Sequence, residues 1–167
     1  CLNNLDIDVL KKKLFDEEIF INEQEMSADP YGQDISSMFA WMKNLQLSGE
    51  PTICDIGANI GLFSLAYASI FKSAKVHSFE PVPYIFKELL KNLQYNPELQ
   101  ERITAYNYGL SNRNETQFLS IPTSNQHERY DANYDNRLYS ILGQGNKKIK
   151  ANLKTLDNWH LENDIGA

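Results

Sequence analysis

Two acidic residues at the ends of short apolar segments constrain the fold of this chain more than any other feature. The first segment, Thr52–Ile56, contains Asp55 and runs into a turn with two glycines. The second segment, Lys75–Phe79, is followed directly by Glu80. In α/β proteins a glycine turn after a strand lets the backbone approach a ligand, and an acid after the next strand accepts ribose hydroxyls. The spacing therefore predicts a nucleoside-binding crevice.

The central region alternates between strand-like and helix-like patterns. Apolar residues recur at helical spacing in residues 61–71 and again from Pro83 to just before Asn96, and further strands are expected at 103–108 and 116–121. Strands and helices that alternate in this way form a parallel sheet with right-handed crossovers. We therefore predict an α/β fold, with a Rossmann-like parallel sheet, flanking helices and a crevice at the carboxyl ends of the strands.

The flanking regions are less regular. Residues 1–50 form an N-terminal segment with a helix expected at about 34–46, and residues 51–167 form the Rossmann-like domain. This domain contains a polar insertion at 122–146. Residues 147–154 alternate between apolar side chains and lysine or asparagine, which is typical of a half-exposed strand, antiparallel or at an edge. The last residues, 163–167, show no obvious closing helix or strand, and we expect the chain to be the cofactor-binding part of a longer protein, truncated at the C-terminus.

Composition limits the classes of partner and the compartment. A net charge of −6 disfavours a nucleic-acid surface, because phosphate binding requires clustered cations. The longest nearly apolar run, residues 60–71, is too short to span a membrane, and the sequence shows no leader pattern. Of the two cysteines, Cys1 is terminal and Cys54 lies in a strand expected to be buried, so neither a disulfide nor a nucleophilic role is expected. We expect a cytoplasmic protein; the sequence does not indicate its oligomeric state.

The position of Asp55, two residues before the first glycine, favours S-adenosylmethionine over a dinucleotide. An acid there can hold the ammonium group of a methionine moiety, directly or through water. A carboxylate such as Glu80 can accept both ribose hydroxyls. Pro81 and Val82 are expected to form one wall for the adenine, with residues 109–112 as the opposite rim. The predicted cofactor-binding residues are Asp55, Gly57, Ala58, Asn59, Gly61, Glu80, Pro81, Leu110 and Asn112.

Some of these residues have a second interpretation that does not involve a ligand. Asn59 can cap the following helix instead of contacting the ligand, and Asn112 can be a turn residue.

The polar insertion supplies only weak candidates for a general base. His127, Glu128, Tyr130 and Asp131 lie in it, and structureless segments of this length often bind substrates. A solvated loop explains the same residues equally well. His127, Asp131 and Asp135 are four apart and could share a helical face with a metal ion, but a charged solvent-exposed face is the simpler interpretation. We therefore expect no metal site and assign no catalytic residue.

Several motifs together resemble those of the FkbM-type S-adenosylmethionine-dependent methyltransferases. They are Asp55-Ile56-Gly57-Ala58-Asn59-Ile60-Gly61, Phe79-Glu80-Pro81, Asn92-Leu93 with Asn96, and Thr155-Leu156-Asp157. The resemblance extends from about Pro51 to Asp157. It implies a class I methyltransferase that transfers a methyl group, in line, from the sulfonium to a hydroxyl oxygen of a sugar or secondary metabolite. The family usually carries a further strand after the last motif, and an alanine and an aspartate at positions 109 and 112.

Two other functions fit the same crevice. An NAD-dependent oxidoreductase shares the ribose-binding acid, but it requires Gly-x-Gly-x-x-Gly for the pyrophosphate, and position 59 is asparagine. A non-catalytic nucleotide-binding module remains compatible with the sequence because no catalytic group is identified. The partner expected from the resemblance is a small-molecule hydroxyl acceptor.

Overall fold

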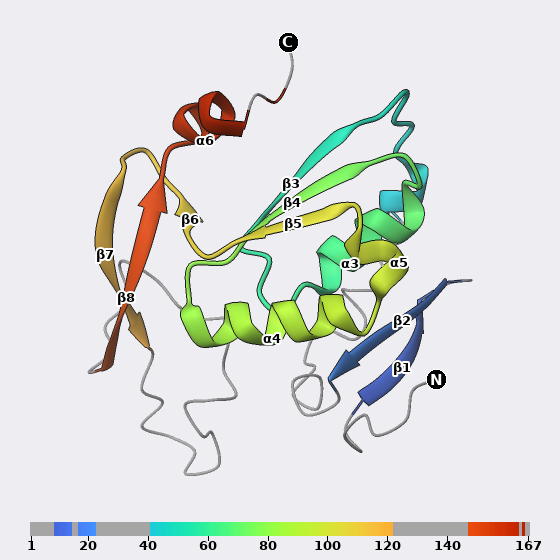
Figure 1. Ribbon diagram of the computed structural model, residues 1–167, viewed down its shortest axis with the longest axis horizontal. Helices are drawn as coiled ribbons and strands as arrows, with labels where there is room; N and C mark the ends of the chain where they lie inside the picture. Colours follow the sequence, from blue (N-terminus) through green and yellow to red (C-terminus); the bar gives the residue numbers. More distant parts are fainter. Residues whose placement is uncertain (1–8, 15–16, 23–40, 122–146, 164, 166–167) are drawn as a thin grey trace.

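The computed structural model describes residues 9–14, 17–22, 41–121, 147–163 and 165 (Figure 1). Its central element is a three-stranded parallel sheet in the order β3-β4-β5. The strands are β3 (Thr52–Ile56), β4 (Lys75–Phe79) and β5 (Ile103–Tyr106). The predicted α/β fold with a parallel sheet and flanking helices is therefore confirmed. The third strand is two residues shorter than expected.

The helices that connect these strands lie together on one face of the sheet. They are α3 (Leu62–Ile70), α4 (Pro83–Gln94) and the short α5 (Pro97–Gln100) (Figure 1). Because the strands are added to the sheet in one direction, crossovers of a single hand carry their helices to the same side. A buried cluster joins that side of the sheet to the helices and includes Leu65, Val76 and Leu89.

The N-terminal segment contributes a hairpin to the same layer. Strands β1 (Val9–Leu14) and β2 (Glu17–Asn22) pair antiparallel, and Ile19 of β2 is buried in the cluster with α3 and α4. Of the helix expected at about 34–46, residues 34–40 lie outside the described residues. Residues 41–44 are helical and bury Met42 in the same cluster, whereas 45–48 are not helical.

A second three-stranded sheet follows β5. It contains β6 (Gly109–Leu110), β7 (Glu115–Ile121) and β8 (Lys147–Lys154), in the order β6-β8-β7. The antiparallel pairing of β8 with β7 agrees with the sequence, and so does the burial of Ala151 and Leu153 on either side of the exposed Asn152. The alternative of an edge strand is wrong among the described residues, because β6 pairs in parallel with the end of β8, bringing Gly109 opposite Leu153.

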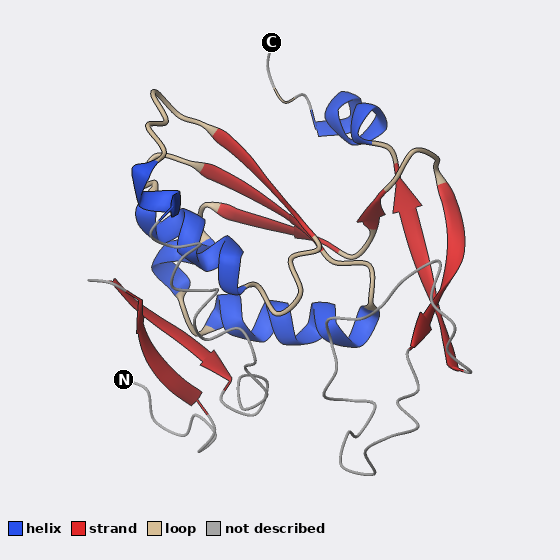
Figure 2. Ribbon diagram, turned by 180° about the vertical axis from the view of Figure 1, so that it is seen from behind, coloured by secondary structure: helices blue, strands red, loops and turns tan. Residues whose placement is uncertain are grey.

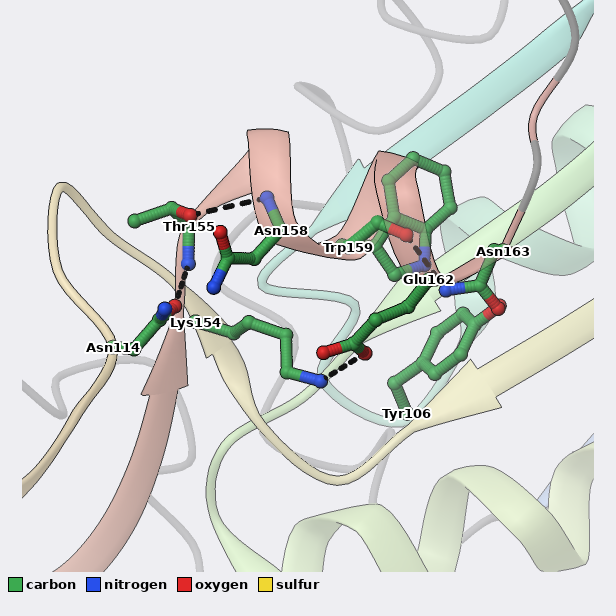
Figure 3. Close-up of polar contacts among 8 residues, drawn as sticks. All are labelled: Tyr106, Asn114, Lys154, Thr155, Asn158, Trp159, Glu162 and Asn163. Carbon is green, nitrogen blue, oxygen red and sulfur yellow. Dashed lines mark hydrogen bonds and ion pairs between the residues drawn. The ribbon is translucent and has the colours of Figure 1, made fainter.

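A helix that the sequence analysis missed, α6 (Leu156–Asn163), follows β8 directly. It ends at Asn163, where the segment expected to lack a closing helix begins. Thr155 caps α6, since its Oγ1 accepts a hydrogen bond from the backbone N–H of Asn158 at 3.2 Å (Figure 3). The backbone N–H of Thr155 donates to Asn114 Oδ1 at 2.8 Å, which ties the helix start to the loop before β7. The motif at 155–157 is thus the beginning of a helix.

Helix α6 lies on the opposite face of the parallel sheet from α3, α4 and α5 (Figure 2). Its Trp159 is buried and meets His77 and Phe79 of β4 edge-on, at ring-centroid distances of 4.9 and 5.2 Å. Tyr106 of β5 donates a hydrogen bond to Asn163 Oδ1 at 3.2 Å, and Lys154 forms an ion pair with Glu162 (Figure 3). Side chains of β4 therefore alternate between two helical layers.

Strand β3 pairs only with β4 in the described part of the chain, so its other edge is not covered. Ile56 is 61% exposed as a result, and Cys54 is only partly buried. The expectation of a fully packed first strand is therefore wrong, because one neighbouring strand shields it instead of two. Burial still raises the pKa of the Cys54 thiol, which disfavours the nucleophilic thiolate.

Candidate functional site

The glycine turn between β3 and α3 has a backbone conformation that its sequence explains. Gly57, Asn59 and Gly61 all have positive φ angles, of 81°, 51° and 87°. Glycine adopts this region without steric cost, and asparagine tolerates it better than most residues. The Gly61 N–H donates to the Ala58 carbonyl at 2.8 Å, and the buried amide of Asn92 donates to the Ile60 carbonyl at 2.9 Å. Helix α4 therefore holds the turn in place.

The same turn is bound to the end of the neighbouring strand. The N–H groups of Gly57 and Ala58 both donate to the Phe79 carbonyl at 3.0 Å. The N–H of Asn59 donates to Glu80 Oε2 at 2.9 Å, and the N–H of Val82 donates to Glu80 Oε1 at 2.8 Å. Glu80 is only 5% exposed, so these two bonds fix its carboxylate beside the turn.

Gly57 and Gly61 differ in the space around them, and this predicts different effects of substitution on stability. A methyl group at Gly61 would lie 3.2 Å from Leu89 Cγ, whereas one at Gly57 would meet nothing within 4 Å. Alanine at either position adopts an unfavourable positive φ, costing about 1–2 kcal/mol. We expect Gly61→Ala to cost roughly 1 kcal/mol more than Gly57→Ala, because it also overpacks the α3–α4 contact.

Urea unfolding of the two glycine variants measures this difference. Equal losses of unfolding free energy would mean that Leu89 moves aside without cost.

Asp55 lies on the side of β3 that faces α3. Its Oδ2 accepts a hydrogen bond of 2.5 Å from Ser64 Oγ. Burial raises the pKa of Asp55, and the Ser64 hydroxyl and backbone amide oppose that shift. No lysine or arginine of the described residues forms an ion pair with Asp55. Asp55 is therefore a partly buried carboxylate with no ion-pair partner among the described residues, an environment compatible with a cationic ligand.

Asp55 lies on β3 and Glu80 directly follows the neighbouring strand β4, on the same side of the sheet. Asp55 is level with Ser78 of β4, and Glu80 follows Ser78 by two residues, so alternation puts both acids on the α3 side. Burial raises the pKa of Glu80, the two backbone N–H groups oppose this, and the charge of Asp55 raises it further. The effect of the Asp55 charge on the pKa of Glu80 agrees with two carboxylates that lie at the edge of the same crevice.

Replacing Asp55 with asparagine is expected to raise the free energy of unfolding of the ligand-free protein at neutral pH. Because the folded-state pKa is raised, the acid costs stability once pH rises through that pKa. Asparagine can still accept the Ser64 hydrogen bond. The gain should shrink as pH falls below the ordinary aspartate range, where both folded and unfolded states are protonated.

Urea unfolding of Asp55→Asn and the unsubstituted protein over a pH series tests this expectation. A gain that does not vary with pH would assign the effect to packing and not to ionisation.

Asn59 has a polar atom without an assigned partner. The residue that caps α3 is Gly61, with no side-chain cap, so the alternative of Asn59 as the helix cap is not observed. Its Oδ1 is buried and accepts no hydrogen bond from any described residue. A buried acceptor of this kind normally has a partner, so Asn59 Oδ1 is available to a donor on a ligand.

The predicted adenine walls differ in their surroundings. Val82 is fully buried in a cluster with Ile85 and Leu119, so its side chain packs against α4 and β7 and does not line an open wall. Pro81 and Leu110 are partly exposed, and Asn112 is exposed. Of the predicted cofactor-binding residues in this group, Pro81, Leu110 and Asn112 are therefore all accessible to a ligand.

The backbone at position 109 approaches its neighbours closely. A methyl group at Gly109 would lie 3.0 Å from Leu153 Cδ2 and 3.4 Å from Pro81, so this position packs β6 against β8 and Pro81. The glycine that replaces the alanine usual in the resembling family thus fits this contact without crowding.

The weak candidates for a general base, His127, Glu128, Tyr130 and Asp131, lie outside the described residues, as does Asp135. Their roles stay predictions. None of the helices in the described ranges is long and apolar enough to cross a membrane.

Sequence reasoning missed two residues that shape the site. Ser64 was counted only within a nearly apolar helix, and Asn92 only as part of a motif. Each is a buried polar residue at 0% exposure in an otherwise apolar helical face, which is the signal that could have identified them.

Comparison with known proteins identifies a matching family. The model of the methyltransferase FkbM domain matches residues 55–166, a range that contains both acids. The methyltransferase sdnD of Sordaria araneosa is 43% identical over 65 residues, which are 39% of this chain and 25% of that protein. The AMB antimetabolite synthetase AmbE of Pseudomonas aeruginosa is 41% identical over 66 residues, which are 39% of this chain and 3% of that protein. The matches thus span a quarter or less of these relatives.

Two similar solved structures align with part of this chain. TYW2 of Pyrococcus horikoshii in complex with MeSAdo aligns with a TM-score of 0.46 and 25% identity, over 61% of this chain and 36% of that chain. The methyltransferase FkbM from Methylobacillus flagellatus KT aligns with a TM-score of 0.39 and 22% identity, over 44% of this chain and 20% of that chain.

Proposed function

Because the chain belongs to the FkbM methyltransferase family, we propose that it binds S-adenosylmethionine at the carboxyl ends of β3 and β4 and methylates a hydroxyl oxygen. The acceptor proposed is a sugar or secondary metabolite. The observation that carries the proposal is the proximity of Asp55, the glycine turn and Glu80. The turn is joined to the end of β4 because the N–H groups of Gly57 and Ala58 donate to the Phe79 carbonyl, and the N–H of Asn59 donates to Glu80.

The residues of this unit fit the proposed cofactor chemically. Asp55 lacks a cationic partner among the described residues, and the methionine part carries an ammonium group. The space above Gly57 is open, which gives the ligand room beside the backbone. Glu80 uses one lone pair of each oxygen for a backbone N–H, and each oxygen retains acceptor capacity for a ribose hydroxyl. Asn59 Oδ1, which has no hydrogen-bond partner among the described residues, offers a further acceptor.

S-adenosylmethionine supplies a methyl group on a positively charged sulfur atom, which an oxygen nucleophile can attack. The contribution of this chain is to bind and orient. Asp55 and Glu80 would hold the two ends of the ligand, and the rigid turn between them limits its motion. Correct alignment of two reacting groups can be equivalent to an effective concentration of about 10⁵ M or more.

The same contacts disfavour a dinucleotide. A pyrophosphate site needs free backbone N–H groups at the turn. Here the N–H groups of Gly57 and Ala58 bind the Phe79 carbonyl, and that of Asn59 binds Glu80. Two nearby carboxylates would also repel the diphosphate.

Calorimetric titration of the chain with S-adenosylhomocysteine and with NAD tests the cofactor. We expect heat of binding with the first ligand only, and binding of NAD alone would overturn the proposal. Methyl transfer from labelled S-adenosylmethionine to a panel of hydroxyl compounds tests the reaction. Binding without transfer to any acceptor would favour a non-catalytic module.

A further inference from the structure

Helix α3 contains two buried serines in an otherwise apolar sequence, and they differ in their surroundings. Ser64 is 0% exposed and donates a hydrogen bond to Asp55 Oδ2 at 2.5 Å. Ser64 Oγ also accepts a hydrogen bond of 2.7 Å from Ser78 on β4, which is fully buried too. Ser69, at 1% exposure, has a buried hydroxyl with no hydrogen-bond partner among the described residues.

The donors and acceptors of these two bonds fix the orientation of the Ser64 hydroxyl. A serine hydroxyl has one proton, and here that proton is directed at the Asp55 carboxylate. Donation from Ser78 occupies a lone pair on the same oxygen and polarises it, which strengthens the bond to Asp55. The three side chains therefore form a relay from the sheet interior, through α3, to the carboxylate.

The other groups around Asp55 do not supply positive charge. From α3 come Ser64 and Tyr67, and from the end of β4 comes Glu80. The pKa of Tyr67 is raised by burial and then by the charge of Asp55, and the pKa of Glu80 is raised by burial with a smaller part from Asp55. Among these groups only Ser64 stabilises the ionised form of Asp55.

We propose that Ser64, held in place by Ser78, is a positioning residue that keeps the Asp55 carboxylate oriented for the ligand's ammonium group. This inference rests on the proposed binding of S-adenosylmethionine. The bond at Oδ2 restrains the side-chain torsion of Asp55, and the backbone of Ser64 adds a second hydrogen bond to the same carboxylate. Loss of the hydroxyl would loosen this restraint and raise the pKa of Asp55, because one of the two donors to the charged form is removed.

Titration of S-adenosylhomocysteine over a pH series tests this role. The ligand ammonium needs the ionised Asp55, so affinity falls as pH decreases through the pKa of the free protein. For Ser64→Ala we expect roughly tenfold weaker binding at neutral pH, the loss of one hydrogen bond to a charged group. The acid-side fall in affinity should begin at higher pH. Ser69→Ala, on the same helix and equally buried, should bind as the unsubstituted chain does.

Two further variants separate positioning from packing. Ser78→Ala removes the outer donor but leaves Ser64 beside Asp55, so a smaller shift in the same direction is expected. In an Asp55→Asn background, Ser64→Ala should no longer shift the pH dependence, because the titrating partner is gone. Thermal unfolding of each variant confirms that titrations are done on folded protein.

The outcomes distinguish the two proposals. If the unsubstituted chain does not bind S-adenosylhomocysteine, the proposed function fails. If it binds, and Ser64→Ala and Ser69→Ala have the same pH profile, the positioning role of Ser64 is wrong. If Ser64→Ala does not fold, Ser78→Ala provides the test. The same pH dependence of S-adenosylhomocysteine affinity in Ser78→Ala as in the unsubstituted chain would contradict the proposed role of the Ser78–Ser64–Asp55 hydrogen bonds.

Discussion

Replacement of Glu80 with alanine is expected to lower the affinity for S-adenosylhomocysteine by about 100-fold or more. Two hydrogen bonds between ribose hydroxyls and a carboxylate are lost, and bonds to charged groups contribute about 1.5–3 kcal/mol each. The substitution also leaves the N–H groups of Asn59 and Val82 without their acceptors. The turn keeps its backbone bonds to the Phe79 carbonyl but loses the bond between the Asn59 N–H and Glu80, beside the proposed ligand position.

Calorimetry measures this effect, with thermal unfolding run beside it to show that the variant is folded. Glu80→Gln retains one oxygen acceptor and removes the charge, so an intermediate loss is expected. Glu88→Ala is the matched control, because it removes a carboxylate from an ion pair with Lys91 on the adjoining helix α4. Unchanged affinity in Glu80→Ala would refute the assignment of the ribose contact.

Replacement of Trp159 with alanine is expected to destabilise the protein by about 3–5 kcal/mol, the usual cost of removing a buried aromatic side chain. Trp159 is 2% exposed and packs edge-on against His77, Phe79 and Tyr106. Its neighbours belong to two strands of the parallel sheet. The substitution therefore removes most of the contact that holds α6 on this face.

Urea unfolding measures the loss. Leu161→Ala on the same helix is the control, because Leu161 is 79% exposed and should change stability by no more than about 0.5 kcal/mol. Similar losses in the two variants would show that α6 is not anchored through Trp159. Amide hydrogen exchange of residues 156–163 should increase in Trp159→Ala and not in Leu161→Ala.

The parallel sheet was predictable because its signal is local. Each of its strands is a short apolar run that ends in a turn residue or an acid, and each connecting helix has an apolar stripe. The acids and the glycine turn were located for the same reason. The carboxyl ends of neighbouring parallel strands must lie together, so the sequence positions of Asp55 and Glu80 imply one crevice.

Helix α6 could not be predicted from local sequence patterns. Among its residues only Trp159 is buried, so the helix has no apolar stripe to detect. Thr155 and Asn158 do form a cap, but these residue types are also common in turns. Packing of one large side chain against the aromatic face of β4 and β5 stabilises the helix, and that face exists only after the sheet has formed.

The central position of β8 has a similar cause. Its alternating lysines indicate one solvent-exposed face, and they say nothing about how many strands pair with its edges. Pairing with β6 depends on the bend after β5, which brings residues 109–110 beside the end of β8.

The strand-turn-helix order and the residue types that could bind a nucleoside follow from local sequence, because propensity, periodicity and glycine turns act over a few residues. The groups that surround each acid depend instead on how the elements pack in three dimensions. The two backbone donors of Glu80, the Ser78–Ser64–Asp55 relay and the lack of a described cation beside Asp55 arise from contacts between separate elements. Burial and hydrogen bonding across those contacts, and not residue identity, set the charge and orientation of the site.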